Sequence, residues 1–267
     1  MEDTGLYIYG FMNAVEEDRL SGLAGIDGRR ALIGLCAGGV TAVASRVDLS
    51  EFGEGAVDLH LEDMIWVNEK AKRHFDIQQE LFSMGTFIPA RFCTIYKDEK
   101  NLYDHIASKQ GWFIEAFEYF SDKDEWTLKI YCDKKIFMER NMDEERQRIK
   151  HQQDGRSGGA SYFMLKKMEG LLEDKAREKL IGIRREIWER IKILACKSVL
   201  IKNMSRQATG RNEDMILNGA LMVGRANAAV FRQECGLIAG EHDGKGLYFD
   251  LSGPWPVYNF AAAETKE

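Results

Sequence analysis

The sequence predicts an α+β protein of two domains, the second of which contains long helices. Three observations support this fold class. The chain of 267 residues is longer than one typical domain. Short aromatic and aliphatic runs of strand length are interspersed with long segments of helical periodicity. The order strand, helix, strand, strand, helix, strand can be followed twice along the chain.

The first domain is predicted over residues 1–121. Glycines crowd the stretch that follows its first strand, so only a short or irregular helix is expected there. Two glycines at 38–39 favour a hairpin turn. The predicted order is strand, weak helix, hairpin, long helix, strand and a final helix: 6–12, 22–28, 30–36 with 40–47, 63–84, 87–96 and 99–120. The first five elements make this domain ferredoxin-like.

The second domain is predicted over residues 122–267, after a short polar turn at 121–124. Its longest helix keeps apolar residues three or four positions apart over more than 30 residues, as a helix requires. The expected order is strand, charged helix, glycine-rich linker, long helix, two strands, helix and strand: 126–132, 134–150, 154–159, 162–195, 197–203, 214–223, 225–238 and 246–251. This is a second β-α-β-β-α-β order.

Composition excludes several classes of protein. The 37 basic and 43 acidic residues give a net charge of −6, so no basic footprint for nucleic acid is present. No apolar stretch approaches the roughly 20 residues that span a bilayer, which predicts no membrane insertion. Five scattered cysteines without CxxC spacing suggest neither disulfides nor a zinc site, and favour a reducing cytoplasm.

No arrangement of residues typical of catalysis is found. The glycines at 22, 25 and 28 lack the lysine and hydroxyl of a phosphate-binding loop. The five histidines form no metal-binding pattern. His74, on the predicted 63–84 helix, is expected to be a partly buried, hydrogen-bonded residue rather than a ligand or base. We therefore expect no metal, no cofactor and no enzymatic activity.

Arg91 is the most conspicuous charge of the first half, because its predicted strand is otherwise apolar. A structural ion pair is the favoured interpretation, since a buried unpaired charge is costly. Binding of a partner and binding of an anion remain alternatives. Pro89 in the same segment indicates an edge strand or a strand start.

The C-terminal segment differs in kind from the rest. Two of the three prolines of the chain bracket Trp255, and they are expected to end the last strand near Leu251. Each aromatic side chain here could bury about 150–250 Å². A clasp that holds the second domain together is favoured over direct partner contact. The residues of this motif are Gly253, Pro254, Trp255, Pro256, Tyr258 and Phe260.

This segment, Gly-Pro-Trp-Pro-Val-Tyr-Asn-Phe at 253–260, resembles the GPWPPYSF ending of the GvpL/GvpF family of gas vesicle proteins. Val257 and Asn259 depart from that pattern. Weaker similarities occur in the family's order, including a helical histidine at His74 and a segment with Cys93 in place of glycine. Their positions are 6–10, 88–96, 125–131, 158–163 and 218–223.

The resemblance implies a minor protein of gas vesicles, the gas-filled shells that give microbes buoyancy. It also implies a cytoplasmic, non-enzymatic assembly factor or shell-associated protein with two α+β domains. Its partners would be the major shell protein, chiefly through the first domain, and other minor gas vesicle proteins. Our expected contact surface is the edge around Phe87, Pro89, Arg91 and Phe92, since an exposed edge can accept a partner strand.

An alternative function is a ferredoxin-like small-molecule sensor or an enzyme of unknown substrate. Ferredoxin-like domains host both, and fold does not decide function. The unusual pairing of Arg91 with Cys93 motivates this alternative.

Overall fold

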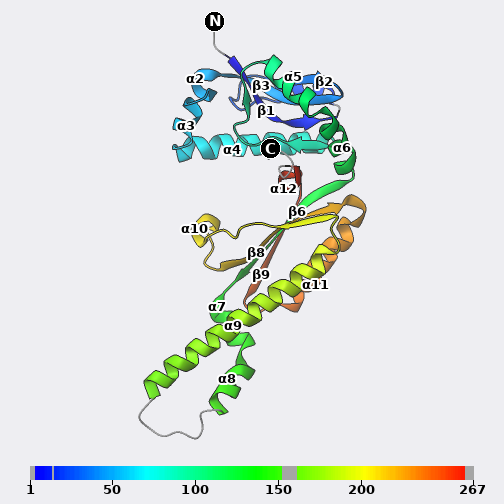
Figure 1. Cartoon of the computed structure of the whole chain (residues 1–267). Helices are drawn as coiled ribbons and strands as arrows, with labels where there is room; N and C mark the ends of the chain where they lie inside the picture. Colours follow the sequence, from blue (N-terminus) through cyan, green and yellow to red (C-terminus); the bar gives the residue numbers. More distant parts are fainter. Residues whose placement is uncertain (1–3, 14, 152–160, 262–267) are drawn as a thin grey trace. The chain divides into compact units, whose positions relative to one another are not determined.

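The computed structural model describes residues 4–13, 15–151 and 161–261. The chain forms two compact units, each built from helices and one sheet (Figure 1). The first unit contains the residues up to Glu125 together with those from Pro254 onward, and the second contains Trp126–Gly253. The α+β fold class is confirmed. The expected linker at 154–159 lies outside the described residues.

The first unit has a sheet in the order β2-β3-β1-β4, with β5 also paired to β1. β1 runs antiparallel to β3, β4 and β5, and β2 runs antiparallel to β3. This is the strand order of a ferredoxin-like fold. The strands are β1 (Thr4–Met12), β2 (Ile33–Ala37), β3 (Val40–Asp48), β4 (Phe87–Pro89) and β5 (Ile95–Tyr96).

Helices cover both faces of this sheet (Figure 1). The long helix α4 (Met64–Met84) covers one face, and Asp63 caps it by accepting from the Ile65 N–H at 2.9 Å. The other face carries α5 and α6, so the expected single helix over 99–120 was wrong. The helix breaks because Lys109 has a non-helical φ of −119°. The remaining helices are α1 (Glu17–Ser21), α2 (Leu49–Phe52), α3 (Ala56–His60), α5 (Glu99–Ser108) and α6 (Gln110–Phe120).

β1 is buried on both faces, which explains its continuous aromatic and aliphatic sequence. Tyr7 and Tyr9 pack in the core beneath α4. Phe11 stacks against Phe113 of α6, with ring centroids 4.6 Å apart. Gly10 is required here, because a Cβ at this position would collide with the carbonyl of Ile88 and the ring of Phe87.

The second unit repeats the same strand order, β7-β8-β6-β9. β7 and β8 are antiparallel, from Lys197 opposite Met222 to Leu200 opposite Gly219. The strands are β6 (Lys123–Cys132), β7 (Lys197–Leu200), β8 (Asp214–Gly224) and β9 (Leu247–Trp255). The helices are α7 (Lys134–Asn141), α8 (Asp143–His151), α9 (Ser161–Lys192), α10 (Arg206–Thr209) and α11 (Ala228–Glu241), with a short 3₁₀ turn η1 (Arg225–Asn227).

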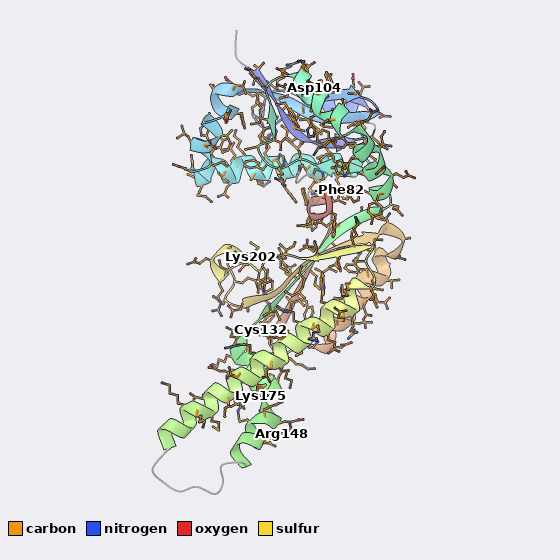
Figure 2. The ribbon with its side chains drawn as sticks, in the orientation of Figure 1. Phe82, Asp104, Cys132, Arg148, Lys175 and Lys202 are labelled. Carbon is orange, nitrogen blue, oxygen red and sulfur yellow. The ribbon has the colours of Figure 1, made fainter. Side chains whose placement is uncertain are left out.

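The second core lies between the sheet and helices α9 and α11 (Figure 2). Ile187 and Ile191 of α9 meet Phe231 of α11 over the central strands. Gly219 lets the ring of Trp188 approach the backbone of β8, because a Cβ there would overlap that ring. None of the described helices combines the length and apolar character that crossing a bilayer requires.

The C-terminal segment departs from expectation in two ways. β9 does not end near Leu251 but continues through Pro254 to Trp255. An edge strand tolerates proline because one side of it makes no ladder bonds, and β9 is an edge of its sheet. The segment from Pro254 also packs with the first unit rather than the second. There its last helix, α12 (Tyr258–Ala261), packs against β4.

Candidate functional site

The expected contact residues lie around β4 and the turn that follows it. The prediction of one strand over 87–96 was wrong, because residues 90–94 form a turn between β4 and β5. Phe87 is buried in the core, so a partner cannot reach its ring. Arg91 is exposed in the turn and forms no ion pair within the described parts of the chain, which excludes the favoured structural ion pair there. Phe92 is half-buried against Trp66.

Buried polar side chains of α4 fix this turn to β1. Gln78 donates to the carbonyls of Tyr9 and Ala90 at 2.7 and 2.9 Å. The Tyr7 hydroxyl and His74 Nδ1 lie 3.0 Å apart. Burial lowers the pKa of His74 to about 4, although its bond to the Ala90 backbone partly opposes this. His74 is therefore neutral at pH 7; it is hydrogen-bonded, as we expected, and more deeply buried than the partly buried residue that we expected.

Cys93 adopts a left-handed backbone with φ of 60°, alone among the described non-glycine residues. Its N–H donates to the Tyr7 hydroxyl at 3.1 Å, which holds it in this conformation. Burial raises the pKa of its thiol to about 11, so it is a weak nucleophile at neutral pH. This disfavours a catalytic pairing with Arg91.

The backbone of Cys93 yields a stability prediction. A left-handed conformation costs an L-residue about 1–2 kcal/mol and costs glycine almost nothing. We expect Cys93→Gly to be about 1 kcal/mol more stable than Cys93→Ala in urea denaturation, the reverse of the usual order of glycine and alanine. Equal stability, or a more stable alanine variant, would contradict the strain argument.

The edge that we expected to be exposed is covered. The short helix α12 packs against β4, and the Glu125 carboxylate anchors α12. Glu125 accepts from the Asn259 backbone N–H at 2.8 Å and from its Nδ2 at 2.5 Å. Glu125 is 1% exposed, and burial raises its pKa to about 7. Addition of a partner strand at β4 would therefore require displacement of α12.

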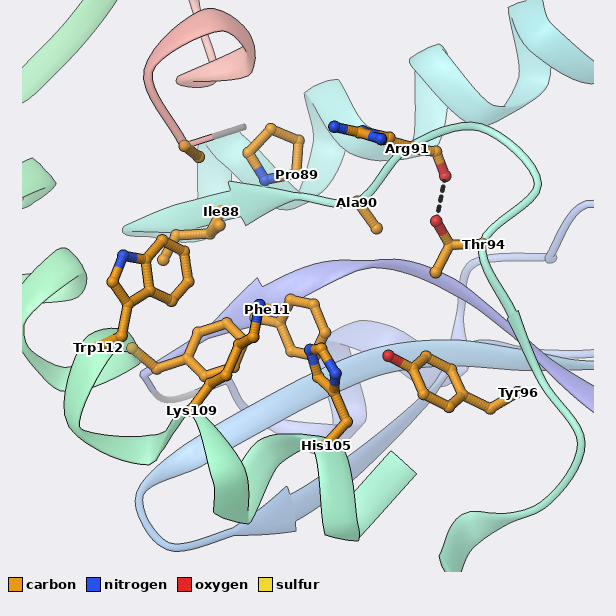
Figure 3. A pocket seen from close by; sticks show the side chains of 12 residues that line it. Phe11, Ile88, Pro89, Ala90, Arg91, Thr94, Tyr96, His105, Lys109 and Trp112 are labelled. Atoms are coloured by element: carbon orange, nitrogen blue, oxygen red, sulfur yellow. Dashed lines mark hydrogen bonds between the residues drawn. The ribbon is translucent and has the colours of Figure 1, made fainter. Parts of the chain in front are cut away.

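A groove remains beside this edge, between the 88–94 segment and helices α5 and α6 (Figure 3). It has a volume of about 210 Å³. We call it the aromatic groove. Its apolar lining comes mainly from Phe11, Ile88, Trp112 and Phe113, and its polar lining includes Arg91, Thr94, His105 and Lys109.

The charges of the aromatic groove have one sign. Arg91 stands on one side and Lys109 on the other, and none of the described residues that line the space carries a carboxylate. His105 has a lowered pKa because it is partly buried and lies near Lys109, so it is neutral at pH 7. The groove therefore suits an apolar segment that carries a negative charge.

Sequence reasoning found Pro89 and Arg91 but missed the opposite wall of this groove. Trp112 and Lys109 lie on a segment that was treated only as an amphipathic helix. The paired aromatics at 112–113 could have indicated two differently directed rings. Gln78 was also missed as a supporting residue, although a polar residue on the apolar face of a helix is a usable signal.

Metal and cofactor chemistry gain no support from the geometry. Among the residues that the structure describes, no three His, Cys, Asp or Glu side chains gather where they could hold a metal ion.

The fold and this site define a two-unit α+β protein with an apolar, cation-rimmed groove in its first unit. A family model described as gas vesicle synthesis protein GvpL/GvpF matches residues 5–262. The chain belongs to this family, which confirms the resemblance of its C-terminal motif.

Individual relatives agree with this assignment. Gas vesicle protein L of Streptomyces sp. (strain CB03234) is 22% identical over 261 residues, covering 98% of this chain and 94% of the relative. The crystal structure of GvpF from Anabaena sp. PCC7120 matches with a TM-score of 0.71 at 20% identity, covering 97% of this chain and 98% of that one. GvpF from Microcystis aeruginosa matches with a TM-score of 0.68 at 19% identity, covering 96% and 98%. These structural matches show the same fold.

Proposed function

We propose that this gas vesicle protein acts in shell formation by binding the major gas vesicle shell protein through the aromatic groove of its first unit. The observation that carries the proposal is the groove itself, with apolar walls and two cations that no carboxylate opposes among its described lining residues. Other minor gas vesicle proteins are further partners in this proposal. The role is that of an assembly factor or a shell-associated component, without catalysis.

The chemistry of the groove supports an apolar protein segment as its occupant. Half-buried aromatic side chains at the centre of an interface commonly contribute most of the binding energy. Trp112 is half-buried in the lining of the groove, and its ring packs edge-on against Phe113 with centroids 4.9 Å apart, which supports such a role for it. Arg91 and Lys109 would pair with a carboxylate or a helix C-terminus at the rim. In this proposal the shell subunit supplies both an apolar segment and the negative group at the rim.

Truncation of Trp112 tests this assignment. We expect Trp112→Ala in the full chain to weaken capture of the co-expressed major shell protein about 30-fold, which corresponds to about 2 kcal/mol. Leu237→Ala, at a 55% exposed apolar residue of the second unit, is the matched control and should bind normally. Unchanged binding by Trp112→Ala, with an unchanged melting temperature, would exclude the groove.

The alternative function, a small-molecule sensor or enzyme, makes a different prediction. Small-molecule sites usually have volumes of about 300–1,000 Å³, above the volume of the aromatic groove. A true ligand should stabilise the protein by about 2–3 kcal/mol at 100-fold excess over Kd. A ligand panel in a thermal-shift assay that gives uniform melting curves would favour the protein-binding function.

A further inference from the structure

A second open surface lies in the second unit, at the edge strand β7. All four residues of β7 are exposed, and β7 is the terminal strand of its sheet. The N–H of Ile201 donates to Asn218 O, and hydrogen-bonded pairs alternate along an antiparallel ladder. The backbone N–H and C=O groups of Val199 are therefore directed toward β8, and the N–H groups of Ser198 and Leu200 point away from the sheet. These outward groups are a template for another strand.

Helix α9 forms a wall next to this edge. Leu200 lies opposite Gly219 in the ladder, and Trp188 of α9 occupies the space that the missing Gly219 side chain leaves. Cross-strand partners share a face of the sheet, so Leu200 points to the same side as Trp188. Leu200 and Ile181 keep 53% and 49% of their surface exposed. Apolar surface thus lies beside unused backbone donors.

The wall and the edge enclose a groove of about 730 Å³, which we call the edge groove. Its charged lining consists of Arg184, Arg185, Lys202 and one carboxylate, Glu189. Lys202, labelled in Figure 2, lies two residues after the end of β7. Glu189 already pairs with Lys192 at 2.8 Å. The edge groove therefore presents positive charge.

Asn218 adds a hydrogen-bonding group to the lining. Its Nδ2 donates to the Lys202 carbonyl at 3.1 Å, which fixes the segment after β7. Its Oδ1 is buried and has no hydrogen-bond partner among the described residues. Because Oδ1 is buried, Asn218 supports the groove by fixing this segment rather than by contacting a docked chain.

We propose that the edge groove binds, by strand addition to β7, an extended segment of a partner protein that carries both acidic and apolar residues on one face. Every second residue of an added strand faces α9, so that face would contact Leu200 and Trp188 through its apolar residues and Arg184 and Arg185 through its carboxylates. Charge decides between occupants. A second copy of this chain would place like charges against each other across a pair of β7 edges. Nucleic acid would gain nothing from the exposed apolar residues. This surface is separate from the aromatic groove and does not depend on its function.

The test uses the full chain and a fluorescent ten-residue peptide, the Glu-Val peptide, in which Glu and Val take turns at every second position and Ser fills the positions between them. The Lys-Val peptide, with Lys in place of Glu, is the control for charge, and a peptide with Ser in place of Val is the control for apolar contact. We expect saturable binding of the Glu-Val peptide and binding at least about tenfold weaker for each control. No saturable binding of the Glu-Val peptide, or equal binding of the Lys-Val peptide, would overturn the proposal.

Two variants locate the binding. Arg184→Glu with Arg185→Glu should weaken the Glu-Val peptide about tenfold and leave the strand edge intact. Ser198→Pro removes one outward donor at a position where an edge strand tolerates proline, and should also weaken binding. Lys175→Glu with Arg177→Glu reverses exposed charges elsewhere on α9 and should change binding less than about twofold.

Binding that survives both groove variants contradicts strand addition here. Self-association of the wild type that Ser198→Pro abolishes would assign the edge to a second copy instead.

Discussion

Replacing Gly10 with valine is expected to lower the free energy of unfolding of the first unit by about 3 kcal/mol. The new Cβ would overlap the Ile88 carbonyl and the Phe87 ring, and neither is the end of a flexible side chain. Gly10 lies opposite Pro89 in the β1–β4 ladder. Relief of the overlap would therefore move β4 away from β1 and disturb the aromatic groove.

Amide hydrogen exchange of β1 in the full chain measures this effect within the first unit. Gly22→Val is the matched control, because nothing lies within 4 Å of a Cβ built at that position and its φ is −79°. We expect the control to differ from the wild type by less than about 0.5 kcal/mol. Equal protection in the two variants would show that β4 does not press against Gly10.

The second large effect is a dependence of the free energy of unfolding on pH. Two buried groups contribute to it in opposite directions. The pKa of His74 is about 4 in the folded protein, against an ordinary value of 6.5. Below pH 6.5, His74 is protonated in the unfolded chain but remains neutral in the folded protein, so stability falls as the pH falls from 6.5 toward 4. The pKa of Glu125 is about 7, against an ordinary value of 4.5. Stability therefore falls as the pH rises from 4.5 toward 7.

Each group can contribute up to about 3 kcal/mol, since one pKa unit corresponds to about 1.4 kcal/mol. Between pH 4.5 and 6.5 the two contributions oppose each other in the wild type. Relative to the wild type, Glu125→Gln should gain stability as the pH rises from 4.5 to 7. His74→Gln should gain relative stability as the pH falls from 6.5 to 4.

Urea denaturation across this pH range measures both differences. For each variant, the difference in free energy of unfolding from the wild type is plotted against pH. The slopes of the two plots should have opposite signs. Parallel curves, or differences that do not change with pH, would mean that neither side chain is buried as the structure shows.

Much of the fold could be predicted from local patterns. Alternation in β6 and the 3.6-residue period of α9 are properties of single segments, so both elements were found close to their observed bounds. The weak first helix was expected at 22–28, but those residues are not helical, and the short helix α1 precedes them at Glu17–Ser21. The repeated strand order followed from these elements.

The missed features depend on contacts between distant residues. The turn after Pro89 is held by Gln78 and Tyr7, and no local pattern separates it from a continuous strand. The place of the C-terminal segment is fixed by Glu125 and Asn259, which are 134 positions apart. For the same reason the sequence suggested an exposed edge at β4, although α12 covers it.

Site-specific photo-crosslinking tests the central claim, that the aromatic groove binds the major shell protein, most directly. A photoreactive amino acid would replace Thr94 in the lining of the groove, or Arg177 as an exposed control on α9. After co-expression with the major shell protein, illumination should give a crosslinked product from position 94 and none from position 177. A crosslink from position 177 alone, or none from position 94 with the melting temperature unchanged, would contradict the account.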